Sequence, residues 1–406
     1  MKKVVVIPTY WGRPSTQGWK EGDAVYDHPT PIDKQGTLGR TLKSMKQLNT
    51  KDYKLALIVC PTCKKIEAEA AKKVRNICQQ VGLEVPTFIV TSDILTKLHN
   101  DFSQDDTNSV SKILSFCGYP NVRNICLLAA ELINAEVAIL IDDDEVFELE
   151  DFIQRAVEHL GEKIYGKSVN AIAGYYLNRH NTFYDDVEIQ PWMTYWDRFT
   201  SKARAFDQII ATDPRIKRTP FAFGGAMVIH RELFRQVPFD PQITRGEDID
   251  YLINCEMFGY SFYLDNTLSI KHLPEPKEHP EWKRVREDIY RFVYQKVKLN
   301  NQVEMPNMTI VTPEDYDPYP GEFLKDNLEE KIFKSNLMLS QKYLSEGDVE
   351  ASNEALRNIF IAVNQATPEF NPFMKYCQTQ KIWSDFMKVL AGNQTKSKIV
   401  AEFQIR

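Results

Sequence analysis

The stretch VAILIDDDEVFE, which runs from Val137 to Glu148, sets five apolar residues directly before four acidic ones. A continuous apolar run of this kind is typical of a strand buried on both faces of a parallel sheet. Such a strand would bring Asp142, Asp143 and Asp144 to its carboxyl end, where open α/β sheets bind their ligands. Carboxylates held together repel one another unless water or a cation compensates their charge. The stretch therefore predicts either a solvated acidic turn before the next helix or a site for a cation.

The first 140 residues alternate short apolar runs with amphipathic patterns. The apolar runs that read as buried strands are residues 2–8, 53–60, 84–91 and 136–141. Apolar residues recur every three or four positions, as on one face of a helix, in 36–49, 64–82 and 122–135. This alternation predicts an α/β fold with a mostly parallel central sheet that helices cover on both faces.

One connection is unusually long. Residues 9–36 separate the first expected strand from the first expected helix and are rich in Gly, Pro, Asp and aromatic side chains. Connections of this length in compact domains are usually functional or disordered. We expect residues 11–36 to form a mobile flap beside the strand ends.

The last third of the chain changes character. Residues 303–323 are rich in proline and lack periodicity, and two amphipathic helices joined near Gly347 follow them. We expect an α/β domain over 1–300, a linker over 301–323 and a C-terminal helical region over 324–406. This helical region carries no acid or histidine cluster, so we expect it to serve packing or to support a homo-oligomer.

Composition narrows the class of protein. The net charge of −6 offers no basic field for nucleic acid. No apolar run approaches the roughly 20 residues that span a bilayer. The seven cysteines are an odd number and scattered, which argues against a disulfide framework, and we interpret the Cys60–Cys63 CPTC as reduced structural thiols. These features indicate a cytoplasmic protein without a transmembrane segment or a nucleic-acid partner.

The acidic triplet has the chemistry of a metal site. Two carboxylates at i and i+2 just past a strand can face one ion, and hard oxygen ligands select Mg²⁺, Mn²⁺ or Ca²⁺. No EF-hand glycine follows the triplet. An ion held by few protein carboxylates keeps positions free for substrate phosphates.

Five further segments fit one known pattern, in order along the chain: VVVIPTYW (4–11), GTLGRTLKSMKQLN (36–49), GYPNVRNICLLAAELINAEVAILIDDDEV (118–146), FAFGGAMVIHRELF (221–234) and RGEDIDYLINCEMFGYSFYL (245–264). Each is degenerate alone, but their order and spacing are fairly specific. Over about residues 1–275 the chain resembles the nucleotide-sugar glycosyltransferases of GT-A fold, particularly the family-2 type. The resemblance implies a GT-A (Rossmann-like) domain, to which the C-terminal helical region expected above is an appendage. It also implies an enzyme, expected to be a hexosyltransferase, that moves a sugar from a nucleotide diphosphate to a hydroxyl of a saccharide or other acceptor.

The resemblance also implies roles for single residues. Its DxD aspartates and a late histidine would hold Mn²⁺ or Mg²⁺ through Asp142, Asp144 and His272, with Asp144 the more direct ligand. Its acidic pair makes Asp248 the general base of an inverting transfer, with Glu247 orienting the acceptor or capping the helix. Contacts to the donor nucleotide are expected from Pro8, Thr9, Tyr10, Asp93, Arg123, Asp142 and Asp143. Asp93 enters only as a substitute, because the family's acid after the second strand is missing from VCPTCKK (59–65).

Acceptor contacts are expected in two places. Gly224 and Gly225 would let an acceptor approach the backbone, although a strand bulge explains them equally well. Trp192 and Trp196 lie in an aromatic segment, and sugar faces stack on such rings, but core packing is the alternative.

Several of these residues also fit a structural role, and two other functions fit the sequence as a whole. The acids at 247, 248 and 250 would also stabilise a helix N-terminus without any catalytic role. His272 would serve as a structural side chain, and Arg123 as a partner in a surface salt bridge. A nucleotidyltransferase on a related fold is the alternative enzyme, although PTYWGRPS is a poor match to its glycine-rich loop. A non-catalytic carbohydrate-binding or scaffold protein is the third class.

Overall fold

A computed structural model describes residues 1–27, 29–101, 110–111, 113–164, 166–275, 279–393 and 396–405. Its larger sheet has the spatial order β10-β12-β9-β11-β5-β1-β3-β4. The strands on this path are β1 (Lys3–Gly12), β3 (Lys54–Pro61), β4 (Thr87–Val90), β5 (Val137–Leu140), β9 (Ala171–Leu177), β10 (Ile216–Arg218), β11 (Met227–His230) and β12 (Phe262–His272). The short strands are β2 (Thr30–Pro31), β6 (Glu145–Val146), β7 (Lys163–Ile164) and β8 (Lys167–Ser168).

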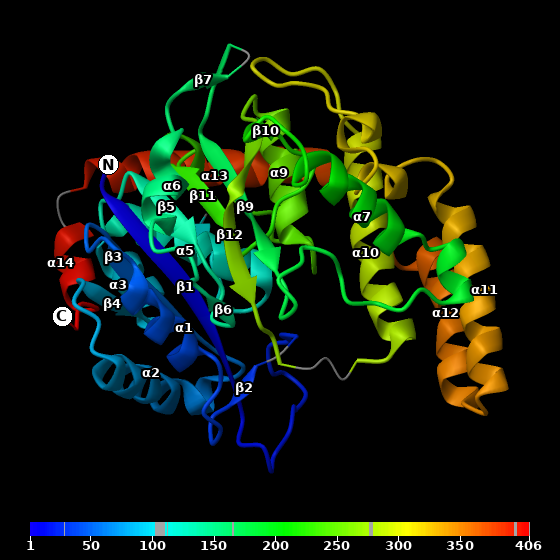
Figure 1. Cartoon of the computed structure of the whole chain (residues 1–406), viewed down its shortest axis with the longest axis horizontal. Coiled ribbons are helices and arrows are strands. Elements are labelled where there is room, and N and C mark those ends of the chain that lie inside the picture. The colour runs from blue at the N-terminus through cyan, green and yellow to red at the C-terminus, as the bar shows by residue number, and fades with distance from the viewer. Residues whose placement is uncertain are drawn as a thin grey trace.

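Helices cover the sheet and extend beyond one end of it (Figure 1). In the first two thirds of the chain they are α1 (Leu38–Ser44), α2 (Glu67–Val81), α3 (Asp93–Asp101), α5 (Tyr119–Leu132), α6 (Phe152–Glu158), α7 (Arg198–Ile209), α8 (Arg231–Phe234) and α9 (Glu247–Met257). The later helices are α10 (Glu281–Asn300), α11 (Leu328–Ser345), α12 (Val349–Asn364), α13 (Pro372–Gly392) and α14 (Lys396–Ala401). The predicted α/β fold with a mostly parallel central sheet and a C-terminal helical appendage is confirmed.

The parallel half of the sheet comes from the first 140 residues. β1 pairs in parallel with both β3 and β5, and β3 pairs in parallel with β4. Their apolar side chains are buried on both faces, which explains why these strands lack the alternation of half-exposed strands. β11 then runs antiparallel to β5 and β9, so the direction of the sheet reverses beside the end of β5. The acidic stretch leaves the sheet at this reversal, a common place for ligand sites.

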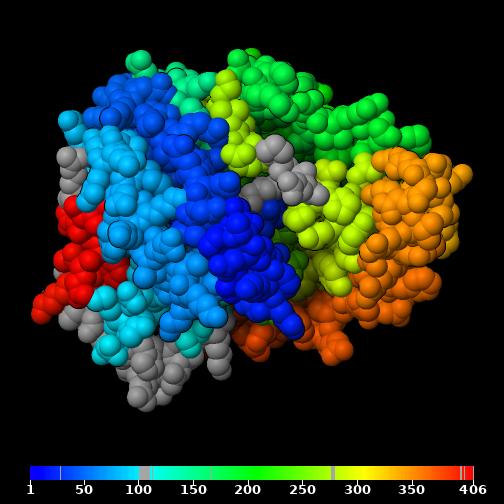
Figure 2. Space-filling model, turned by 90° about the horizontal axis from the view of Figure 1, so that it is seen from below, coloured from blue at the N-terminus to red at the C-terminus, as the bar shows by residue number. Residues whose placement is uncertain are grey.

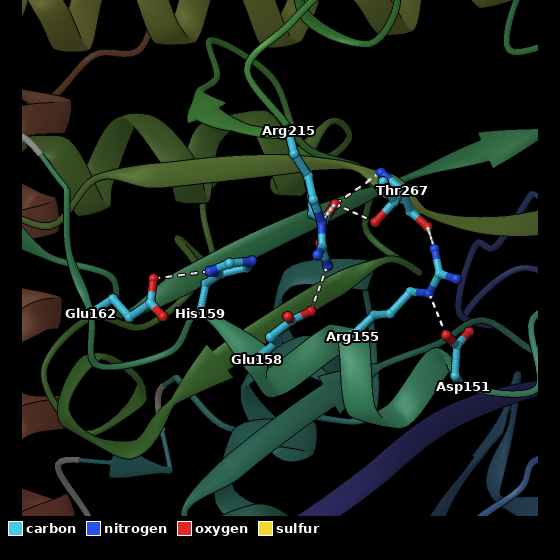
Figure 3. Close-up of polar contacts among 8 residues, drawn as sticks. Asp151, Arg155, Glu158, His159, Glu162, Arg215 and Thr267 are labelled. Atoms are coloured by element: carbon cyan, nitrogen blue, oxygen red, sulfur yellow. Dashed lines mark hydrogen bonds and ion pairs between the residues drawn. The ribbon is translucent and has the colours of Figure 1, made fainter.

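β12 pairs irregularly with its neighbour β9. Its pairing with β9 shifts register between Leu264 and Ser269. Figure 3 shows how α6 is fastened there: Arg215 donates to Glu158 at 2.8 Å, and Arg155 donates to the carbonyl of Thr267 at 3.2 Å. Beyond this irregularity β12 pairs with β6, which brings the end of β12 against the acidic stretch.

The C-terminal helices are joined to the α/β domain. In Figure 1, α10, α11 and α12 lie together at one end of the molecule. α13 returns to the domain, where the fully buried Trp383 donates its indole N–H to the Phe234 carbonyl at 2.8 Å. Near the C-terminus, the Ile89 N–H of β4 donates to the Phe403 carbonyl at 2.8 Å. The boundaries expected at residues 300 and 323 stay a prediction.

The structure also bears on the cysteines and on membrane-spanning helices. All seven cysteines are free thiols, as expected for a chain without a disulfide framework. Within the described residues, no helix combines the length and apolarity that crossing a membrane requires.

A buried lysine joins α10 to α9. Lys298 is fully buried, and its ammonium lies 2.6 Å from Asp250 and 3.1 Å from Asp240. The hydroxyl of Tyr294 donates to the same Asp240 carboxylate at 2.8 Å. Burial alone would lower the pKa of Lys298, but the two carboxylates outweigh it and raise that pKa above its usual value. The ammonium is therefore compensated only while both carboxylates stay in place.

We expect Lys298→Ala to lower the free energy of unfolding by about 3–5 kcal/mol, because two carboxylates would lose their cation in a dry site. Urea denaturation measures the change. Lys388→Ala, which removes an exposed lysine of α13, is the control and should change stability little. If Lys298→Ala were as stable as this control, the buried ion pairs would not hold α10 in place.

Candidate active site

The turn of the acidic triplet is held from two sides. On one side, the Thr41 hydroxyl of α1 donates to the Asp143 carbonyl at 2.7 Å. On the other, the Leu273 N–H just after β12 donates to the Asp144 carbonyl at 3.0 Å. The next residue, Glu145, lies opposite His272 in the β6–β12 pair. The triplet is therefore a fixed turn at the carboxyl end of β5.

Arg123 of α5 supplies the nearest positive charge. Its side chain is 3% exposed, and its Nη2 lies 2.8 Å from Asp142 Oδ1. Its Nε lies 3.6 Å from Glu247 Oε1, so one guanidinium stands between the two acidic motifs. Nε and Nη1 are buried without a hydrogen-bond partner among the described residues. This arginine orders the acids in the structure and still has donors for a ligand.

His272 and Asp144 meet at the end of β12. Their closest atoms, Nε2 and Oδ2, are 3.3 Å apart. The imidazole also stacks on Tyr176, with ring centroids 4.6 Å apart. Asp142 is turned toward Arg123, and no group of three or more His, Cys, Asp or Glu side chains within the described ranges forms a complete metal site. The donor set suits a hard divalent ion that completes its shell with ligand oxygens.

Sequence reasoning missed the role of Glu145. Its side chain is fully buried and accepts the Asp142 N–H at 2.9 Å. Burial, followed by the charges of Asp142 and Asp144, raises the pKa of this carboxyl well above its usual value. The Tyr176 hydroxyl beside it accepts the Gly225 N–H at 2.8 Å. Nothing in the sequence distinguishes this acid from its solvated neighbours, because its burial comes from strands distant along the chain.

The glycine pair lets buried ionisable groups lie against the backbone. A Cβ on Gly224 would lie 2.6 Å from Arg123 Nη2. A Cβ on Gly225 would lie only 2.0 Å from Glu145 Oε1. Gly224 lines a cavity, whereas Gly225 packs behind it against Glu145. Glycine is thus required at these two positions by side chains of the protein itself, Arg123 and Glu145, and not by an acceptor.

We expect Gly225→Ala to destabilise the protein by about 1–3 kcal/mol and to displace the turn of Asp142, because Glu145 must move away. Thermal unfolding measures the effect. Gly392→Ala is the control, since nothing lies within 4 Å of its added Cβ. In a double-mutant cycle, Gly225→Ala should cost much less in a Glu145→Ala background, and full additivity would contradict the clash.

The second acidic motif begins α9. Gly246 precedes it in the left-handed region at φ 69°, and a Cβ at this position would lie 2.5 Å from Arg291 Nη1, so the missing side chain leaves room for the arginine. Asp248 Oδ2 accepts the Gly224 N–H at 3.3 Å. Glu247 is buried, and burial together with the charge of Asp248 raises the pKa of its carboxyl. The two acids therefore occupy different environments on adjacent residues.

Two cavities meet at this motif. The smaller, about 300 Å³, is lined by Tyr10, Arg123, Asp142, Asp143, Asp144, Gly224 and Glu247. The larger, about 820 Å³, extends between α7 and α10. The side chains that line both are Tyr176, Arg245, Asp248, His272, Pro274, Glu275 and Arg291. Of the residues expected in the site, the structure brings nine to the smaller cavity, and Asp248 and His272 lie where the two cavities join.

Six expected residues do not line either cavity: Gly225, which packs behind Gly224, and the five that follow. Pro8 and Thr9 are buried within β1, before Tyr10 reaches the cavity. Asp93 is exposed at the start of α3, after a strand two places from β1. Trp192 and Trp196 are 3% and 1% exposed, so neither ring offers a face to a sugar. Both belong to the core, which is the alternative that the aromatic segment left open.

The long connection after β1 packs against the domain. Arg13 makes two hydrogen bonds to Asp23, at 2.6 and 2.7 Å, and the Ala24 N–H donates to the Thr62 carbonyl at 2.8 Å. Tyr26, which sequence reasoning also missed, packs with its ring centroid 4.5 Å from that of Tyr10. Figure 2 shows this segment, in dark blue, and α10, in yellow-green, on the same face of the molecule. Whether the segment changes order with a ligand stays a prediction.

Comparison with known proteins gives only distant likenesses. No family model and no curated protein matches the chain. Among solved structures it is similar to the mannosyltransferase PcManGT from Pyrobaculum calidifontis, solved with GDP-Man and Mn²⁺, at 12% identity over 96% of this chain and 86% of that one, with a TM-score of 0.47. It is also similar to a mycobacterial protein (14% identity, 72% of each chain, TM-score 0.37). A third is GalNAc-T7 with UDP, GalNAc and Mn²⁺ (16% identity, 73% of this chain, 51% of that one, TM-score 0.39). At such identities and TM-scores the likenesses concern the fold alone.

Proposed function

We propose that this chain is a metal-dependent glycosyltransferase that moves a sugar from a nucleotide diphosphate to an acceptor hydroxyl. One observation carries the proposal. A fixed carboxylate turn with a buried arginine lines one cavity, and that cavity meets a second one at Asp248. Two substrates that react with each other need adjoining sites with a catalytic group at the junction.

The smaller cavity suits the donor. Asp144 and His272, with Asp142 beside them, would hold Mn²⁺ or Mg²⁺. When bound, such an ion neutralises charge on a diphosphate leaving group. The free N–H groups of Arg123 would donate to phosphate oxygens. Tyr10 and Tyr119, with ring centroids 5.4 Å apart, would give the base or ribose an aromatic wall.

The larger cavity suits the acceptor. Asp248 would take the proton of the attacking hydroxyl from the face opposite the leaving group, which gives inversion in one displacement. Glu247 lines only the smaller cavity, so it would orient groups there and would not meet the acceptor. Gly224 would hold Asp248 in place through its N–H.

A ligand screen tests the proposal directly. Thermal unfolding would be followed with UDP-, GDP- and ADP-sugars, each with and without Mn²⁺, because a bound ligand raises apparent stability. We expect at least one donor to raise the melting temperature only in the presence of the metal. Stabilisation by nucleoside triphosphates but by no nucleotide sugar would favour a nucleotidyltransferase instead. No response to any donor would favour the non-catalytic alternative.

A further inference from the structure

Two helices face each other across the larger cavity and present cations to it. α7 contributes Arg198 and Lys202, one turn apart, and α10 contributes Arg284 and Arg291, two turns apart. The aromatic lining of the cavity includes Phe183 and Phe199, which are half-buried, and Tyr184, which is exposed, so these rings can meet a ligand. The cavity thus combines aromatic surface with seven basic side chains and four acidic ones (Asp185, Asp186, Asp248 and Glu275), in a chain whose net charge is −6.

Two of these cations share one counter-ion. Arg198 Nη1 lies 2.7 Å from Asp288 Oδ2, and Arg291 Nε lies 3.2 Å from Asp288 Oδ1. Asp288 is 2% exposed, and the arginine charges overcome its burial and hold its pKa below the usual value. The charge of Asp248 also acts on Arg291, so two carboxylates face these two guanidinium groups. Asp288 also fixes both side chains, which leaves their other N–H groups pre-oriented.

The other two cations are less tightly engaged. Lys202 pairs with Asp185 at 3.0 Å, but the two side chains are 25% and 33% exposed, and such solvated pairs are weak. Arg284 lines the cavity and forms no ion pair within the ranges that the structure describes. A ligand anion could replace water around both groups at little cost.

We propose that the acceptor is an anionic saccharide whose phosphate or carboxylate binds between α7 and α10. This inference rests on the proposed function, because it places the accepting hydroxyl at Asp248 and the anion on the basic walls. Guanidinium groups match the two oxygens of such anions with paired N–H donors. The aromatic side chains would contact the sugar ring. Neutral saccharides would leave the charge of Arg284 uncompensated and that of Lys202 only weakly paired.

The test compares three probes that differ at one carbon: glucose, glucuronate and glucose 6-phosphate. Their dissociation constants would be measured calorimetrically on the full chain at low and high salt. We expect one or both anions to bind about tenfold more tightly than glucose, with a preference that weakens as salt rises. The two anionic arms separate carboxylate from phosphate recognition.

A matched pair of variants locates the site. Lys202→Gln with Arg284→Gln removes two cations that line the cavity, and we expect it to abolish the anion preference. Arg204→Gln with Lys283→Gln removes two cations from the same helices that do not line it, and should keep the preference. If both double variants lost the anion preference equally, or if both kept it, the proposed position of the anion site would be wrong.

The wild-type donor screen separates the two proposals. Donor binding without any preference for the anionic probes would overturn this inference and leave the glycosyltransferase proposal standing. Anion preference without binding of any donor would overturn both, because an anion site with no donor beside it is not an acceptor site.

Discussion

We expect Asp248→Asn to lower kcat by about 10²- to 10⁴-fold, the usual contribution of a positioned general base, and to leave the fold intact. Asparagine has the same shape and can still accept the Gly224 N–H, which Asp248 accepts at 3.3 Å. It has no basic oxygen for the acceptor proton. Steady-state kinetics measures the loss, and unchanged thermal unfolding shows that the site has not collapsed.

Glu247→Gln is the matched variant, since it changes the adjacent acid in the same way. Glu247 lines only the smaller cavity, which we propose for the donor, so its replacement should act mainly on donor binding and less on kcat. A larger fall in kcat for Glu247→Gln than for Asp248→Asn would move the base to Glu247. Proton NMR of the first-formed product supplies the second criterion, because retention of the donor's anomeric configuration would exclude the single displacement.

We expect Asp144→Ala to abolish measurable transfer and to remove any stabilisation that Mn²⁺ gives to the proposed donor complex. The side chain is the acid nearest to His272, and it is 20% exposed, so its loss opens no cavity in the core. Removing one of several neighbouring carboxylates also relieves repulsion. We therefore expect the variant without ligands to unfold at the wild-type temperature or above it.

Two controls make the result specific. Asp385→Ala removes an exposed acid of α13 and should keep both activity and the metal response. His272→Ala should weaken the metal response if the imidazole is a ligand. Full turnover by Asp144→Ala in the presence of a chelator would refute a metal-dependent reaction.

The sequence was most informative where burial is local. Continuous apolar runs predicted β1, β3, β4 and β5, because a strand covered on both faces excludes polar residues along its whole length. Gly82 ends α2 in the left-handed conformation, as its place after the helical pattern predicts. The position of the carboxylate cluster could also be predicted, because the acids directly follow the apolar run that forms the strand.

Contacts between distant segments could not be predicted. Glu145 is buried because β6 pairs with β12, more than 120 positions later in the chain. Trp192 and Trp196 are enclosed by the core, with Phe323 packed 5.1 Å from the Trp196 ring centroid. Aromatic residues occur both in protein cores and in sugar-binding sites, so only the fold shows which role a given ring has.

The junction of the two cavities at Asp248 has a consequence for how the substrates can be identified. Asp248 lines both cavities, so water that enters the larger cavity in place of an acceptor would meet the same carboxylate. The base that would activate a hydroxyl can activate water in the same position, so the donor would be hydrolysed slowly without an acceptor. The released nucleoside diphosphate can be followed with a coupled assay. The donor can therefore be identified first, and candidate acceptors can then be ranked by how far they divert this futile reaction.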